Sequence, residues 1–192
     1  VLTKELLERC DKVVCVELDT RLFPVLNDTL SGYENLTLIN GDILKIDLKK
    51  VIAEHFDGME VFVCANLPYY ITSPVIMRLL EEKLPFKKII VMVQKEAGDR
   101  LCAKVGTRES GAVTVAVNYY AKARKLFDVS RGSFFPSPKV DSCVIELDLT
   151  QKGDYPVIDE KLFFQTVKAA FAQRRKTVLN ALSSGMGIEK SK

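Results

Sequence analysis

Short β-branched runs alternate with segments of helical apolar spacing, and this alternation constrains the fold more than any other feature of the sequence. The runs with the length of buried strands, each bounded by polar or turn residues, are 13–17, 36–40, 61–66 and 89–94. The helical patterns between them are 21–30, 48–55 and 74–82, the last with Ser73 as its expected N-cap and Pro74 at its first position. This pattern predicts an α/β protein with a doubly wound sheet, in which ligands bind at the carboxyl ends of the strands.

The second half of the chain departs from this alternation of strand and helix patterns. It predicts a helix over 95–104, an apolar segment over 112–120, and strands near 125–130 and 142–149. The connection 131–141 is rich in Gly, Pro and Ser, so we expect these two strands to pair as an antiparallel hairpin that closes the sheet. Beyond Tyr155, helical patterns over 160–171 and 174–182 predict a small helical module.

Composition excludes several classes of protein. Apolar residues make up 47% of the chain and charged residues 28%, which is typical of a globular protein. No apolar run approaches the roughly 18 residues that would span a bilayer. The five cysteines are scattered and His55 is the single histidine, so we expect no metal site, no disulfides and no histidine-based catalysis. A reducing cytoplasm is the expected compartment.

Charge is distributed unevenly along the chain. Residues 1–60 hold 7 Lys and Arg against 12 Asp and Glu, a net charge of −5, whereas residues 61–192 hold 21 against 13, a net charge of +8. Basic residues that gather in one half of a chain are typical of proteins that bind polyanions, although a solvated basic face gives the same pattern.

Three polar residues stand where predicted strands end: Glu17 in Val-Glu-Leu-Asp, Asp42 in Asn-Gly-Asp-Ile, and Asn66 in Asn-Leu-Pro-Tyr-Tyr. Because the carboxyl ends of parallel strands meet at one edge of a sheet, we expect the three to face one crevice. A carboxylate there can accept two hydrogen bonds from a ribose diol, and a second can accept one from a purine amine. Glu17 and Asp42 suit these roles, but each could equally be an N-cap or a turn acid.

The segment 66–69, Asn-Leu-Pro-Tyr, carries the sharpest chemical signal. A buried Asn66 carboxamide and the backbone carbonyl before Pro68 can both accept hydrogen bonds from an amino group, while the Tyr69 ring can stack on a flat base. Two such acceptors hold the N–H groups of an exocyclic amine out of the plane of its ring, which restores nucleophilicity without a general base. The alternative is an ordinary turn, but the placement in register with Glu17 and Asp42 favours the functional hypothesis.

Seven segments in order carry a family resemblance: Val-Glu-Leu-Asp (16–19), Gly-Asp-Ile-Leu (41–44), Asn-Leu-Pro-Tyr-Tyr (66–70), Gln-Lys-Glu (94–96), Gly-Ala-Val-Thr-Val (111–115), Phe-Phe-Pro-Ser-Pro-Lys-Val-Asp-Ser (134–142) and Phe-Ala-Gln-Arg-Arg-Lys-Thr (171–177). Over nearly its whole length the chain resembles the small-subunit ribosomal RNA adenine N6,N6-dimethyltransferases of the KsgA type. The erythromycin-resistance methylases of large-subunit RNA share the N-x-P-Y and F-x-P-x-P-K-V patterns, but segments 94–96 and 171–177 favour the small-subunit type.

The resemblance implies a Rossmann-like class I methyltransferase fold that uses S-adenosylmethionine, with a catalytic domain over 1–150 and a small C-terminal helical domain over 151–192. It implies dimethylation of two adjacent adenosines near the 3′ end of the small-subunit RNA, on the immature small ribosomal subunit, by a monomer. The family's first strand and glycine-rich turn would precede Val1, and its helical domain would continue beyond Leu182. We therefore expect this sequence to be a piece of a longer enzyme.

The resemblance also assigns residues by matching position. Glu17 and Leu18 would hold the cofactor ribose, and Asp42 with the Ile43 amide would hold the cofactor adenine. Asn66 would lie between the methionine moiety and the target nitrogen. The residues expected to surround the target base, which must be flipped out of its stack to be reached, are Asn66, Leu67, Pro68, Tyr69 and Phe134.

Basic residues are the expected phosphate contacts on RNA, and they are Lys95, Arg100, Arg131, Lys139, Arg174, Arg175 and Lys176. Two alternatives to the small-subunit enzyme stay open: a large-subunit methylase of the erythromycin-resistance type, and a non-catalytic ribosomal RNA-binding assembly factor. A DNA adenine methylase is disfavoured because a target-recognition domain is absent from this sequence.

Overall fold

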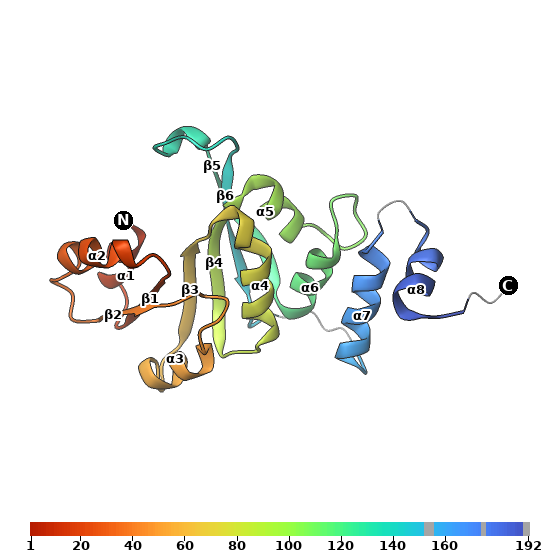
Figure 1. Cartoon of the computed structure of the whole chain (residues 1–192), viewed down its shortest axis with the longest axis horizontal. Helices are drawn as coiled ribbons and strands as arrows, with labels where there is room; N and C mark the ends of the chain where they lie inside the picture. Colours follow the sequence, from red (N-terminus) through yellow and green to blue (C-terminus); the bar gives the residue numbers. More distant parts are fainter. Residues whose placement is uncertain (152–155, 174–175, 190–192) are drawn as a thin grey trace. The chain divides into compact units, whose positions relative to one another are not determined.

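The computed structural model describes residues 1–151, 156–173 and 176–189. These residues form two compact units (Figure 1). The first consists of residues 1–61 and 82–85, and the second of residues 62–81 and the described residues from 86 onward. Among the described residues no helix is both long enough and apolar enough to cross a membrane.

The first unit is built around a two-stranded parallel sheet. Strands β1 (Val13–Glu17) and β2 (Leu36–Asn40) pair along their full lengths. The helices of this unit are α1 (Leu2–Leu7), η1 (Thr20–Leu22), α2 (Phe23–Thr29) and α3 (Leu48–His55). The Asn35 amide donates hydrogen bonds to the carbonyls of Leu7 and Cys10, at 3.0 and 2.8 Å, and so fixes the end of α1 to the start of β2.

The second unit contains a four-stranded sheet with the order β3, β4, β6, β5. Its strands are β3 (Val61–Asn66), β4 (Phe86–Gln94), β5 (Lys122–Val129) and β6 (Ser142–Asp148). Strand β6 runs antiparallel to both neighbours, and a bulge interrupts its register with β5 between Lys125 and Phe127. The expected hairpin of the last two strands is thereby confirmed.

One face of this sheet forms the core of the second unit. The residues of β4 and β6 on this face are at most 1% exposed, and they are Ile89, Val91, Val93, Cys143, Ile145 and Leu147. Helix α5 (Lys95–Leu101) packs against β4, β5 and β6, and α6 (Ala112–Tyr120) contacts α4 (Thr72–Glu81). Burial alternates along β4, as expected for a strand covered by helices on one face, whereas β6, the strand between β4 and β5, is buried at all positions but Val144.

The last two helices continue outward from α6 (Figure 1). Helix α7 (Glu160–Phe171) packs on α6 and α8 (Val178–Met186) packs on α7. Rings of Tyr120 and Phe164 stack at a centroid distance of 5.4 Å, and the Tyr120 hydroxyl donates a 2.8 Å hydrogen bond to Glu160. These contacts fix α7 to the sheet-bearing part of the unit. The predicted division into domains at residue 150 stays a prediction.

Several predicted boundaries need correction. The expected strands 13–17, 36–40 and 61–66 match residue for residue, but β4 begins at Phe86 rather than at 89. Ser73 is not an N-cap, because the 3₁₀ turn η2 (Tyr69–Ile71) leads directly into α4 at Thr72. Helix α8 begins at Val178 rather than at 174, since the Thr177 hydroxyl accepts the Asn180 N–H and caps it there.

The described strands pair in two separate sets. Strands β1 and β2 form a sheet of their own, which shares no strand with β3–β4–β6–β5 in the described part of the chain. The α/β character is confirmed, because strands alternate with helices through β1, β2 and β3, and β1 and β2 are parallel.

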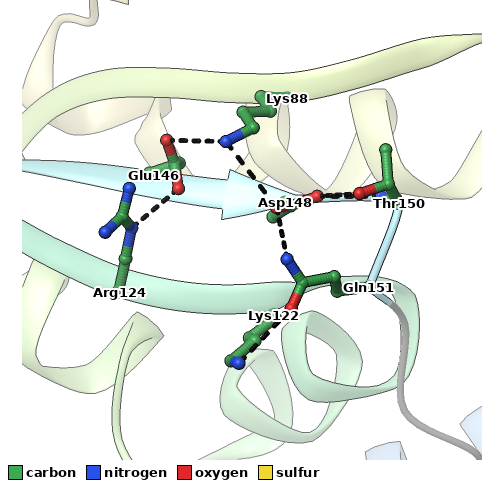
Figure 2. Close-up of polar contacts among 7 residues, drawn as sticks. All are labelled: Lys88, Lys122, Arg124, Glu146, Asp148, Thr150 and Gln151. Carbon is green, nitrogen blue, oxygen red and sulfur yellow. Dashed lines mark hydrogen bonds and ion pairs between the residues drawn. The ribbon is translucent and has the colours of Figure 1, made fainter.

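The opposite face of the four-stranded sheet carries a row of ion pairs (Figure 2). Arg124 on β5 donates a 2.7 Å hydrogen bond to Glu146 on β6, and the Lys88 ammonium on β4 lies 3.4 Å from the same carboxylate. The Glu146 side chain is only 9% exposed. The Arg124 guanidinium holds the pKa of Glu146 below its ordinary value of 4.5.

Asp148, the next residue on this face, extends the row (Figure 2). Its carboxylate accepts hydrogen bonds from the Thr150 hydroxyl at 2.6 Å and from the Gln151 amide at 3.0 Å, and Lys88 lies 3.7 Å away. The Thr150 hydroxyl holds the pKa of Asp148 below its ordinary value of 3.8. A nearly buried carboxylate is costly without a partner, and these contacts satisfy Asp148 and tie the end of β6 to β4.

This row predicts an acid-sensitive stability. A carboxyl whose pKa is lower in the folded state stabilises the fold above its unfolded pKa, and this contribution is lost as the pH falls through the folded pKa. We expect Glu146→Gln to lower the free energy of unfolding by about 1 kcal/mol at pH 7, a small effect because solvent screens the exposed Arg124. The difference from the parent protein should shrink once the pH falls below 4.5 and then vanish.

Urea unfolding between pH 3 and pH 7 measures this difference. Glu109→Gln is the matched control, since Glu109 is exposed and forms no ion pair with another described residue. A stability difference for Glu146→Gln that stays constant down to pH 3 would contradict the assigned role of the carboxylate.

Candidate functional site

The ends of β1 and β2 are joined by hydrogen bonds. The Gly41 N–H donates to the Glu17 carbonyl at 3.0 Å, and the Asn40 amide donates to the carbonyls of Glu17 and Leu18 at 3.1 and 3.3 Å. A Cβ atom on Gly41 would lie 2.5 Å from the Ile46 side chain, so only glycine fits there. Two of the three expected strand ends are thus adjacent.

Both carboxylates of the first unit are half-buried at these strand ends. One oxygen of Glu17 accepts the Asp19 N–H at 2.8 Å, which orients the carboxylate at the end of β1. One oxygen of Asp42 accepts the Leu44 N–H at 2.9 Å, and the other lies 3.8 Å from the exposed Lys45 ammonium. Each carboxylate therefore keeps acceptor positions for a ligand, as a ribose diol or a purine amine would need. Of the neighbouring residues, Leu18 is 64% exposed and Ile43 is half-buried.

The third strand end belongs to the second unit. Asn66 is the last residue of β3, and the following Leu67 is buried and donates its N–H to the Met92 carbonyl at 3.4 Å. The Pro68 carbonyl accepts the Ile71 N–H at 3.1 Å and closes the turn. A crevice formed jointly with Glu17 and Asp42 remains a prediction.

The expectation of a buried carboxamide is wrong, because Asn66 is exposed where its strand ends. Among the described residues, none donates a hydrogen bond to the Asn66 side chain or to the Leu67 carbonyl. The two acceptors proposed from the sequence are thus both available to a ligand. A bound base would itself have to exclude water from them.

Tyr69 is held at this edge by a residue to which the sequence assigned no role. Its hydroxyl lies 2.8 Å from the Ser142 hydroxyl, and Ser142 is fully buried. Ser142 is the first residue of β6 and pairs with Gln94 of β4 and Val129 of β5. Ser142 closes the motif 134–142, but only the fold shows that its hydroxyl faces the tyrosine.

The connection 131–141 lies at the same end of the strands as Tyr69. Its ends are braced, because Asp141 accepts the Arg131 N–H at 2.9 Å and the Ser137 hydroxyl donates to the Arg131 carbonyl at 2.9 Å. The Asp141 carbonyl also accepts the Lys95 N–H at 3.0 Å. Phe134 is half-buried in this connection, and in the described part of the chain its ring does not stack with that of Tyr69. A pocket shared by the two rings remains a prediction.

Lys95, the first expected phosphate contact, is engaged within the protein. Its ammonium lies 2.9 Å from Asp128, and Lys125 pairs with Asp99 and Asp128 at 2.9 and 3.2 Å. Lys95 holds the pKa of Asp128 below its ordinary value. This group joins the start of α5 to β5, so Lys95 has a structural role whether or not it binds RNA.

The other basic residues differ in their surroundings. Arg100 pairs with Glu96 at 3.1 Å, one turn away on α5. Arg131 and Lys139 are exposed and neither forms an ion pair with a carboxylate of a described residue. Lys176 is exposed too, whereas the expected contacts Arg174 and Arg175 lie outside the described residues.

Among the described residues, no group of three or more His, Cys, Asp or Glu side chains could hold a metal ion. The chemistry available at the edge of the four-stranded sheet is therefore that of hydrogen-bond acceptors, aromatic rings and cations. This combination suits an aromatic base with an exocyclic amine, carried on a polyanion.

Comparison with known proteins gives one family. The model of the family described as ribosomal RNA adenine dimethylase matches residues 1–191. The chain is 50% identical over 186 residues to ribosomal RNA small subunit methyltransferase A of Bacillus cytotoxicus, covering 96% of the chain and 64% of that protein. It is 49% identical to the protein of the same name from Bacillus mycoides, covering 100% and 66%. The chain thus spans about two thirds of the length of these relatives.

Solved structures share the fold. A dimethyladenosine transferase from Plasmodium falciparum matches with a TM-score of 0.75 and 29% identity, covering 95% of this chain and 63% of that one. The 23S rRNA methyltransferase ErmE matches with a TM-score of 0.72 and 23% identity, covering 96% and 71%. The Rossmann-like class I methyltransferase fold is thereby confirmed.

Proposed function

Because the chain belongs to the ribosomal RNA adenine dimethylase family, we propose that it transfers methyl groups from S-adenosylmethionine to N6 of adenosine in small-subunit ribosomal RNA. The observation that carries this proposal is the turn 66–69, where two hydrogen-bond acceptors that no described residue uses follow the end of a strand, beside a fixed tyrosine. We further propose that two adjacent adenosines near the 3′ end are dimethylated, and that a monomer acts on immature small subunits in the cytoplasm.

The residues of the first unit fit the cofactor. Glu17 and Asp42 offer half-buried carboxylates at neighbouring strand ends, and these are the acceptors that a ribose diol and an adenine amine require. Glu17, Leu18, Asp42 and Ile43 would hold the nucleoside part. When bound, S-adenosylmethionine would supply a methyl group that is attached to a positively charged sulfur. The rest of the cofactor would leave as a neutral thioether.

The residues of the second unit would prepare the nucleophile. The Asn66 carboxamide oxygen and the Leu67 carbonyl accept the two N–H groups of the target amine. This arrangement turns the nitrogen lone pair out of conjugation with the ring. Tyr69 stacks on the flipped base, and Phe134 covers its other face. As the new N–C bond forms and the S–C bond breaks, the nitrogen releases one N–H proton to water at the exposed Asn66, so the mechanism needs no histidine.

Labelled methyl transfer tests the function. The protein, at the full length that its gene encodes, is incubated with methyl-labelled S-adenosylmethionine and with small or large ribosomal subunits from cells that lack the modification. We expect label in the small-subunit RNA alone. Label in the large-subunit RNA would instead favour the erythromycin-resistance type. RNA binding without transfer to either subunit would favour an assembly factor.

Tyr69 gives a graded test of base stacking. We expect Tyr69→Ala to lower kcat/KM for methyl transfer roughly 10- to 100-fold, since stacking of a base on an aromatic ring is worth about 1–3 kcal/mol. Tyr69→Phe keeps the ring and loses only the bond to Ser142, so it should stay within about tenfold of the parent protein. Ser142→Ala is the matched control and should behave like Tyr69→Phe. Equal losses for Tyr69→Phe and Tyr69→Ala would show that the ring itself does not matter.

A further inference from the structure

Phe135 is the most exposed aromatic side chain among the described residues. Its exposure is 103%, against 83% for Tyr70 and 58% for Phe127. A buried phenylalanine ring is one of the largest single contributions to folding, and this chain gains none from Phe135. Its neighbour Phe134 is half-buried, so the backbone of this segment directs one ring inward and the other outward.

The exposure of Phe135 is imposed by a braced segment. The 3₁₀ turn η3 (Arg131–Ser133) precedes it, with the Phe134 N–H donating to the Arg131 carbonyl at 3.3 Å. After it, the Ser137 hydroxyl donates to the same carbonyl at 2.9 Å. Hydrogen bonds before and after Phe135 thus fix the backbone that exposes its ring to solvent. A ring exposed by a fixed backbone favours a role in binding.

Positive charge flanks the ring. Arg131 lies four residues before Phe135 and Lys139 four residues after, and both are exposed without a carboxylate partner in the described part of the chain. The Arg131 guanidinium donates a hydrogen bond to the Lys139 carbonyl at 3.4 Å, which holds these two residues of the connection close together. One carboxylate oxygen of the nearby Asp141 accepts the Arg131 N–H at 2.9 Å. An aromatic ring between two cations matches an unpaired base between two phosphates.

The position of this connection indicates which RNA base the Phe135 ring would contact. It leaves the sheet at Val129 and returns at Ser142, whose hydroxyl contacts Tyr69 beside the acceptors for the target amine. A base that flips out of a stack leaves the face of its neighbour uncovered, at a cost that an inserted ring can offset. We propose that Phe135 stacks on the base next to the flipped adenosine, with Arg131 and Lys139 on the adjoining phosphates. This inference rests on the proposed function.

The test compares substitutions at two exposed phenylalanines. Phe135→Ala, Phe135→Leu and Phe135→Tyr are made in the full-length protein, with Phe127→Ala on β5 as the matched control. Methyl transfer to unmodified small subunits gives kcat/KM, and calorimetry gives the Kd for S-adenosylmethionine. We expect Phe135→Ala and Phe135→Leu to lower kcat/KM about 5- to 100-fold, and Phe135→Tyr to retain it. Phe127→Ala should stay within about twofold of the parent protein, and the cofactor Kd should not change.

Two results would overturn the inference while the proposed function stands. One is an active parent protein in which Phe135→Ala behaves like Phe127→Ala, which would mean that the ring contacts no substrate. The other is full activity of Phe135→Leu, which would assign an apolar contact instead of a stack. A parent protein that transfers no methyl group to adenosine would overturn the proposed function and this inference together.

Discussion

Replacement of Asn66 by alanine is expected to lower the rate of methyl transfer about 100- to 1,000-fold, the range found when one polar group that stabilises a transition state is removed. The Asn66 side chain is exposed at the end of β3, and no described residue donates a hydrogen bond to it. Its loss therefore removes no hydrogen bond with another described residue. The whole effect should appear in the reaction, where one of the two acceptors for the target amine is missing.

The same change at Asn27 provides the control. Asn27 is also exposed, lies within helix α2 and carries none of the proposed chemistry. Asn27→Ala should retain full activity, and both variants should unfold at the temperature of the parent protein. An Asn66→Ala protein that retains more than about a tenth of the parental rate would contradict the role of the carboxamide.

Gly98→Ala is expected to give the largest loss of stability. Gly98 lies in α5 where the helix meets the sheet, and a Cβ atom there would lie 2.2 Å from the sulfur of Cys143 and 3.3 Å from a methyl group of Val93. Cys143 is fully buried, so its sulfur has little room to move. Alanine gains up to about 1 kcal/mol in helix propensity. We expect the clash to outweigh that gain and to lower the free energy of unfolding by about 1–3 kcal/mol.

A compensating substitution makes this prediction specific. Cys143→Ala removes the sulfur, so the Gly98→Ala Cys143→Ala protein should be at least about 1 kcal/mol more stable than the two single effects predict by addition. Gly32→Ala is the matched control, since a Cβ atom there meets nothing within 4 Å. Urea unfolding of the four proteins measures the coupling. Purely additive effects would show that the contact with Cys143 does not restrict residue 98.

Local structure could largely be predicted from the sequence, since periodicity determines it. Strands β1, β2 and β3 and helices α3 and α7 have the predicted bounds, because their apolar spacing and caps agree. The start of α4 was not predicted, since the Tyr69–Ile71 turn continues into the helix without a break. The order of the strands within a sheet could not be predicted, because no pattern within a strand specifies its neighbours.

The positions of the candidate residues at strand ends could be predicted from the sequence, but the contacts that hold them could not. Glu17, Asp42 and Asn66 were identified from their places at strand ends, which the structure bears out for each residue separately. The exposure of Asn66 and the bond from Ser142 to Tyr69 could not be predicted, because they depend on residues that are distant in the sequence. The exposure of Phe135 could not be predicted for a different reason: it is a property of the folded connection, and two adjacent phenylalanines do not show which ring faces water.

The most direct test of the proposed function is a measurement in cells. The gene is deleted and then restored, either with the parent sequence or with Asn66→Ala, and the modified nucleosides of each purified ribosomal RNA are quantified by mass spectrometry. We expect N6,N6-dimethyladenosine in small-subunit RNA to disappear on deletion, to return with the parent sequence, and to stay absent with Asn66→Ala. Small-subunit RNA that keeps its N6,N6-dimethyladenosine after deletion, or regains it with Asn66→Ala, would contradict the function proposed for this chain.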